Sequence, residues 1–65
     1  MKISDNLKKI RAKKGYPLEK VARLADLSLN TVVKIESGVN KNPTIDTLAK
    51  IAKALEVNVD DLIHK

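Results

Sequence analysis

A chain of 65 residues is long enough for one small domain, and residues 1–65 are expected to share a single core. Cysteine is absent and histidine occurs once, so disulfides are excluded and neither a metal site nor catalysis is expected. We also expect no cofactor. The sequence shows no apolar run of membrane-spanning length and no signal peptide, which predicts a cytoplasmic location.

Basic residues are concentrated in the N-terminal third. The formal net charge is +5. Residues 1–23 contain eight basic and two acidic side chains, whereas residues 24–65 contain five basic and six acidic ones. An uneven charge of this kind favours a polyanionic partner. On charge alone, a merely solubilising surface explains the pattern equally well.

Apolar residues recur at helical spacing in five segments, and no segment alternates as a strand does. Helices are expected at about 4–14, 17–25, 28–37, 44–55 and 59–64. Gly15 and Gly38 are suitable stop residues, Pro17 fits the first turn of the second helix, and Ser28 and Thr44 are good N-caps. The sequence therefore predicts a compact all-α domain of five helices.

The fourth and fifth segments are expected to close the core. The fourth has the clearest amphipathic stripe, formed by Ile45, Leu48, Ile51, Ala52 and Leu55. Asn58 is expected to cap the fifth, whose first turn carries Asp60 and Asp61, and Leu62 and Ile63 would dock it.

The second and third segments are separated by a very short turn at Asp26 and Leu27. Two helices joined so tightly cross at a large angle and need small residues, here Ala22 and Ala25, where the backbones approach. This layout is typical of a helix-turn-helix whose second helix enters the DNA major groove. An ordinary helical hairpin has the same spacing, so both interpretations stay open on the pattern alone.

A longer motif carries a family resemblance. It comprises Ala22-x-x-Ala25-x-Leu27-Ser28-x-x-Thr31-Val32-x-Lys34-Ile35-Glu36-Ser37-Gly38, preceded by Ile10-Arg11-x-x-Lys14-Gly15 and followed by Asn42-Pro43-Thr44 and Leu48-x-x-Ile51-Ala52-x-Ala54-Leu55. With these residues the chain resembles the phage repressor and Cro-type (Xre-type) helix-turn-helix family. The resemblance implies a lambda-repressor-like fold and sequence-specific binding of double-stranded DNA. It further implies a nucleoid-associated transcriptional regulator, expected to be a repressor, that acts as a homodimer on an inverted-repeat operator.

Three features depart from the family pattern. Pro17 and Leu18 stand where the family usually has Ser or Thr followed by Gln, so the DNA contacts typical of that position are not expected from them. Asp26 replaces the Gly often found in the turn, and Asp tolerates left-handed backbone angles. The chain stops after the fifth helix, so no sensor domain is expected.

At about 100° per residue, Val32, Ile35 and Glu36 share the inner face of the third helix. Asn30, Lys34 and Ser37 point nearly the opposite way, with Val33 close to them and Leu29 on the flank. The base-contact candidates are Leu29, Asn30, Val33 and Lys34. An Asn side chain can form two hydrogen bonds with an adenine edge, and a Lys side chain can donate to guanine or to a phosphate. Aliphatic side chains can contact thymine methyl groups. The phosphate-contact candidates are Thr31, Ser37, Asn40, Lys41, Lys20 and Arg23. The competing interpretation is that these side chains are ordinary solvated surface.

Glu36 is the one carboxylate expected on that inner face, where it is costly unless paired. Arg11 follows Leu7 by four residues, as Glu36 follows Val32. We therefore expect a partly buried, structural Arg11–Glu36 ion pair, and the family resemblance implies a similar one.

The alternative function is an antitoxin-like protein-interaction module that uses an apolar patch of Leu18, Leu29 and Val33 to bind a partner protein. Membrane binding is a still weaker hypothesis, because the basic residues do not lie opposite one broad apolar face. Two smaller expectations concern other residues. Val57, Val59 and Ile63 are suggested as the dimer contact, and Tyr16 is expected to pack over the first two helices.

Overall fold

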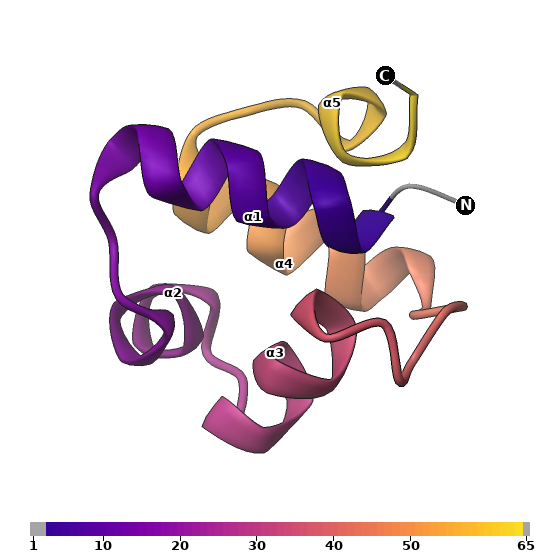
Figure 1. The fold of residues 1–65 in the computed structure, drawn as a ribbon, viewed down its shortest axis with the longest axis horizontal. Coiled ribbons are helices and arrows are strands. Elements are labelled where there is room, and N and C mark those ends of the chain that lie inside the picture. The colour runs from indigo at the N-terminus through magenta and orange to yellow at the C-terminus, as the bar shows by residue number, and fades with distance from the viewer. Residues whose placement is uncertain (1–2, 65) are drawn as a thin grey trace.

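The computed structural model describes residues 3–64, and this range contains five α-helices and no strand. The helices are α1 (Ile3–Lys14), α2 (Leu18–Ala25), α3 (Leu29–Glu36), α4 (Ile45–Leu55) and α5 (Val59–Ile63) (Figure 1). The predicted all-α, five-helix fold is confirmed, with helix ends within two residues of the expected ones. None of the helices in residues 3–64 is long and apolar enough to cross a membrane.

The helix starts follow from short polar side chains. Ser28 Oγ accepts a hydrogen bond from the Thr31 amide at 3.1 Å, and Thr44 Oγ1 accepts one from the Thr47 amide at 3.1 Å. Two of the three predicted N-caps, Ser28 and Thr44, are thereby confirmed. Asn58 is likewise the N-cap residue of α5, and its amide donates to Asp61 Oδ2 at 3.0 Å. Pro17 was expected inside the first turn of α2 but is its N-cap, because its ψ of 162° is extended rather than helical.

Helices α1 to α4 each end at or just before a residue whose backbone is in the left-handed conformation. Gly15 and Gly38 have φ of 72° and 85°, as expected of glycines that stop a helix. Asp26 and Glu56 also adopt positive φ, at 57° and 58°, and end α2 and α4. The turn between α2 and α3 therefore forms with Asp26 in the position often filled by Gly. The left-handed Glu56 was not predicted.

The core lies between α1, α2, α3 and α4, with α5 closing it through Leu62. Its buried apolar residues are Ile3, Leu7, Val21, Ala22, Ala25, Val32, Ile35, Leu48, Ile51, Ala52, Ala54, Leu55 and Leu62. The prediction that Ile45 belongs to this core is wrong, because its side chain is 66% exposed. Ile45 is the first residue of α4, and the buried part of the stripe begins one turn later, at Leu48.

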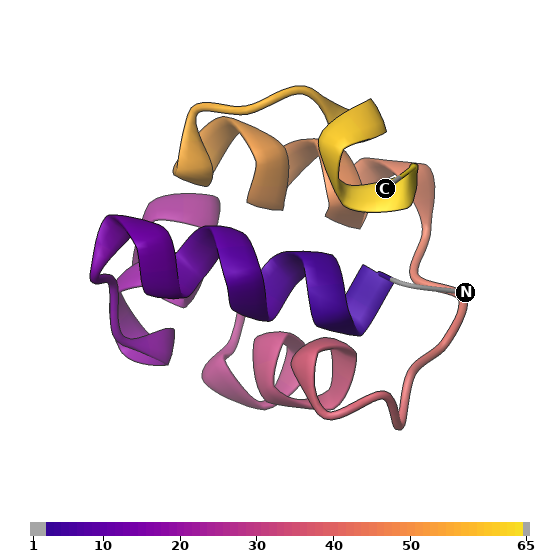
Figure 2. The ribbon, with the colours of Figure 1, turned by 45° about the horizontal axis from the view of Figure 1, so that its top comes forward.

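Helix α1 is central, with α3 on one side and α4 and α5 on the other (Figure 2). Asn6 is a buried polar residue in α1, and its Nδ2 donates to the Leu62 carbonyl at 2.9 Å. The last carbonyls of a helix have no partner inside it, so this bond satisfies one of them and fixes α5 against α1. Sequence reasoning missed this contact, although Asn6 shares the face of α1 that carries Ile3, Leu7 and Ile10.

Candidate nucleic-acid interface

Helix α3 is divided sharply into an inner and an outer face. Val32 and Ile35 are fully buried and Glu36 is 7% exposed. Because side chains repeat at about 100° per residue, Asn30 and Lys34 point nearly away from Val32, and both are exposed. Leu29 and Val33 lie one turn apart beside them and are 43% and 37% exposed. The four predicted base-contact residues are therefore all exposed, and we call them the outward strip, which runs from Leu29 on the flank to Asn30 and Lys34 on the far side of the helix.

The N-terminal end of α3 is held by a small hydroxyl cluster. Ser28 Oγ and Thr31 Oγ1 lie 2.8 Å apart and share a hydrogen bond, in addition to the bond from the Thr31 amide. Thr31 is half-buried on the flank of the helix. Its hydroxyl already takes part in the cap. Thr31 is therefore a poorer candidate for a phosphate contact than the exposed side chains among the six.

The loop after α3 is tied by hydrogen bonds to the last turn of the helix. The Lys34 carbonyl accepts from the Asn40 amide at 2.9 Å and from Ser37 Oγ at 3.3 Å. Asn40 Oδ1 in turn accepts from the Asn42 amide at 3.1 Å, which tightens the loop. Asn40 and Lys41 are exposed, so this loop carries a cationic and an amide side chain beside the C-terminal end of α3.

The two phosphate candidates on α2 have different surroundings. Arg23 is exposed, whereas Lys20 Nζ lies 4.2 Å from the centre of the Tyr16 ring in a cation–π contact. Lys20 also borders a depression that includes Leu24 of α2 and Lys50 of α4, so it faces α4. The half-buried Tyr16 packs against the core, and it borders the same depression as residues of α2 and α4.

The apolar patch proposed for a protein partner is not continuous. Leu18 is half-buried and packs against the core, so of its three residues only Leu29 and Val33 are exposed. Val57, Val59 and Ile63, suggested for a dimer contact, likewise pack partly against the core. In residues 3–64 no three acidic or histidine side chains are grouped as a metal ion would need.

The structure brings Arg11 and Glu36 together in a bidentate pair. Arg11 Nε and Nη2 donate to the two Glu36 carboxylate oxygens at 2.6 and 3.0 Å, and Nη1 donates to the Tyr16 carbonyl at 2.8 Å. The hydrogen bond to Glu36 raises the pKa of Arg11, so the guanidinium stays charged at any physiological pH. This pair joins α1 to α3 and holds the carboxylate on the inner face.

Comparisons with known proteins agree with this geometry. The profile of a family described as "Helix-turn-helix" matches residues 7–62. The chain is 33% identical over 63 residues to the HTH-type transcriptional regulator SinR of Bacillus subtilis and 32% identical over 63 residues to SinR of Bacillus licheniformis. It is also 36% identical over 52 residues to SlrR of Bacillus subtilis.

These alignments cover most of this chain but only part of each relative. They include 97% of the chain and 57% of each SinR protein, and 80% of the chain and 34% of SlrR. No solved structure matches the chain significantly.

Proposed function

We propose that this chain, which belongs to the helix-turn-helix family, binds double-stranded DNA sequence-specifically. Helix α3 enters the major groove, and the protein regulates transcription as a repressor. The observation that carries the proposal is the outward strip of α3. An amide, an ammonium group and two aliphatic side chains stand exposed on one face, while the opposite face is anchored in the core. A B-DNA major groove is wide enough to admit such a helix.

Each outward residue has a chemical role in this proposal. Asn30 donates and accepts at an adenine edge, and Lys34 donates to guanine O6 and N7 or to a phosphate. Leu29 and Val33 contact thymine methyl groups. Arg23, Asn40 and Lys41 provide the main phosphate contacts, which set the position of the protein on the duplex. Lys20, Thr31 and Ser37 contribute less, because their polar groups already contact Tyr16, Ser28 and the Lys34 carbonyl.

The remaining parts of the proposal concern the whole protein. We assign it a binding role rather than a catalytic one, and a cytoplasmic, nucleoid-associated location. The proposed partner is an inverted-repeat operator bound by a homodimer, with half-sites about one helical turn of DNA apart. Among the relatives, SinR and SlrR are named as transcriptional regulators, which supports this assignment. The antitoxin-like alternative is not favoured, because Leu18 contributes to the core rather than to an exposed patch.

Selection of bound duplexes from a random library tests the proposal directly. We expect a recovered inverted repeat, whose affinity exceeds that for random DNA by about 10³-fold or more and falls linearly with log salt concentration. Enrichment of no sequence, or binding that is insensitive to salt, would contradict it.

Two substitutions separate base from phosphate contacts. Asn30→Ala is expected to cost about 1–3 kcal/mol on the selected site and to relax the preference at one position. Lys41→Ala should weaken selected and random duplexes equally and reduce the salt slope by about 1. Fluorescence anisotropy across a salt series measures both. If the two variants behaved alike, the assignment of Asn30 to base recognition would be wrong.

A further inference from the structure

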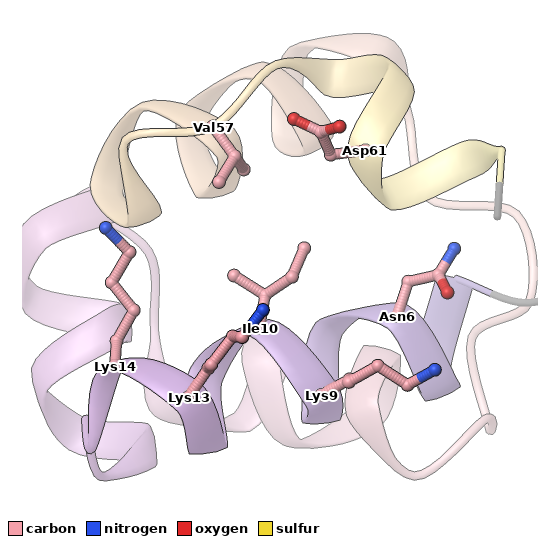
Figure 3. A pocket seen from close by; sticks show the side chains of 7 residues that line it. All are labelled: Asn6, Lys9, Ile10, Lys13, Lys14, Val57 and Asp61. Carbon is pink, nitrogen blue, oxygen red and sulfur yellow. The ribbon is translucent and has the colours of Figure 1, made fainter.

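Helix α5 and the segment between α4 and α5 lie on the side of α1 that faces away from α3 (Figure 2), and a second surface feature lies between them and α1. It is a groove of about 660 Å³ between α1 and the segment that follows α4. Ile10 of α1 and Val57 of that segment are half-buried and point toward one another across it (Figure 3). The groove therefore has an apolar floor wide enough for an inserted side chain.

The two walls of the groove carry opposite charge. Lys9, Lys13 and Lys14 line the α1 wall, and Asp61 of α5 lies on the other. Lys14 Nζ is 3.5 Å from Glu56, and the ion pairs within residues 3–64 include neither Lys9 nor Lys13. Lys9 and Lys13 thus present ammonium groups that take part in none of these ion pairs.

We propose that this groove docks an acidic amphipathic helix of a partner protein. One or two aliphatic residues of the helix pack between Ile10 and Val57, and carboxylates along its flank pair with Lys9 and Lys13. Anchors one turn apart, with charges on the adjoining face, are how such helices bind apolar grooves. A nucleic-acid backbone fits less well, because it has no aliphatic group for the floor and its phosphates would meet Asp61.

The position of the groove makes the partner compatible with DNA. Helix α3 and the groove lie on opposite sides of α1, so an occupied groove leaves Asn30 and Lys34 accessible. The inference goes beyond DNA binding and does not depend on it. Its failure would leave the DNA proposal intact, because the two surfaces are measured with different probes.

The test uses the 65-residue chain, labelled with ¹⁵N, and a display library of helical peptides about four turns long. Each peptide carries Leu, Ile or Met one turn apart and Glu along one flank. Selected peptides are titrated against the parent, Lys13→Glu and Lys8→Glu. The last is the matched control, because Lys8 is exposed on the same helix outside the groove and the two substitutions change the net charge equally.

The expected result is a set of amide shifts centred on Ile10, Val57 and Asp61, with Lys13→Glu weakening the peptide about fivefold more than Lys8→Glu. Replacing the apolar anchors of the peptide by Ser should abolish these shifts, and duplex DNA should not produce them. The proposal is overturned if no selected peptide distinguishes the two variants. It is equally overturned if the shifts centre on Asn30 and Lys34, or if duplex DNA shifts the groove residues.

Discussion

Glu36→Gln is expected to destabilise the domain strongly, because it removes one charge from a largely buried ion pair. The Glu36 side chain is 9% exposed and that of Arg11 is 23% exposed, so solvent screens this pair little. Exposed pairs contribute about 0–1 kcal/mol, whereas breaking a fully buried one costs about 3–5 kcal/mol. Since Arg11 retains some contact with water, the expected loss is about 2–3 kcal/mol.

That loss is large for a domain of this size. At roughly 0.05–0.15 kcal/mol per residue, the described part of the chain has a total unfolding free energy of about 3–9 kcal/mol. A loss of 1 kcal/mol lowers the Tm of a domain this small by about 4–8 °C, so Glu36→Gln should melt about 8–24 °C below the parent. Thermal unfolding followed by far-UV circular dichroism measures this directly.

The same substitution at Glu56 is the matched control. Glu56 is paired with Lys14 at 3.5 Å, but its side chain is 78% exposed, so Glu56→Gln should change the unfolding free energy by less than about 0.5 kcal/mol. If Glu36→Gln and Glu56→Gln melted together, the Arg11–Glu36 pair would not stabilise the fold. Arg11→Met should cost more than Glu36→Gln, because the Tyr16 carbonyl also loses its donor.

Three further outcomes follow from particular contacts. Asn6→Ala should cost about 1–3 kcal/mol and raise amide hydrogen exchange chiefly in α5, because the Leu62 carbonyl loses its buried donor; equal exchange rates in α5 would refute this. Glu56→Gly should raise the urea midpoint by an amount equivalent to about 0.5 kcal/mol, since Gly adopts a φ of 58° without strain, and a lowered midpoint would count against it. In anisotropy titrations Arg23→Ala should weaken DNA binding more than Lys20→Ala, whose ammonium faces Tyr16; the reverse order would show that Lys20 leaves the ring to reach a phosphate.

The helices were predictable because their signals are local. Apolar spacing, the Ser28 and Thr44 caps and the two stop glycines each specify backbone geometry within a few residues. Ile45 was misplaced for the opposite reason. Its position in the amphipathic stripe is correct, but burial depends on which neighbouring helix reaches the first turn of α4, and periodicity carries no information about that.

In the candidate site, too, features set by local sequence were predictable and features set by the packing of other segments were not. Helical periodicity from Val32 correctly separated the buried Glu36 from the exposed Asn30 and Lys34. Lys20 was selected for its charge, and the cation–π contact with Tyr16 depends on how the loop before α2 folds. The left-handed Glu56 gave no sequence signal, because Glu, unlike Gly, Asn or Asp, is not enriched in that conformation.

The two buried polar contacts of α1 explain why the molecule has two separate surfaces. Arg11 bonds to Glu36 and thereby limits rotation of α3 about its own axis, while Asn6 bonds to the Leu62 carbonyl and limits movement of α5. If α3 turned by one residue, about 100°, Glu36 would lose its partner and Val32 or Ile35 would leave the core. The outward direction of Asn30 and Lys34 is therefore set by contacts on the opposite face of the helix. The same argument applies to α5, whose attachment to α1 sets the width of the groove between Ile10 and Val57.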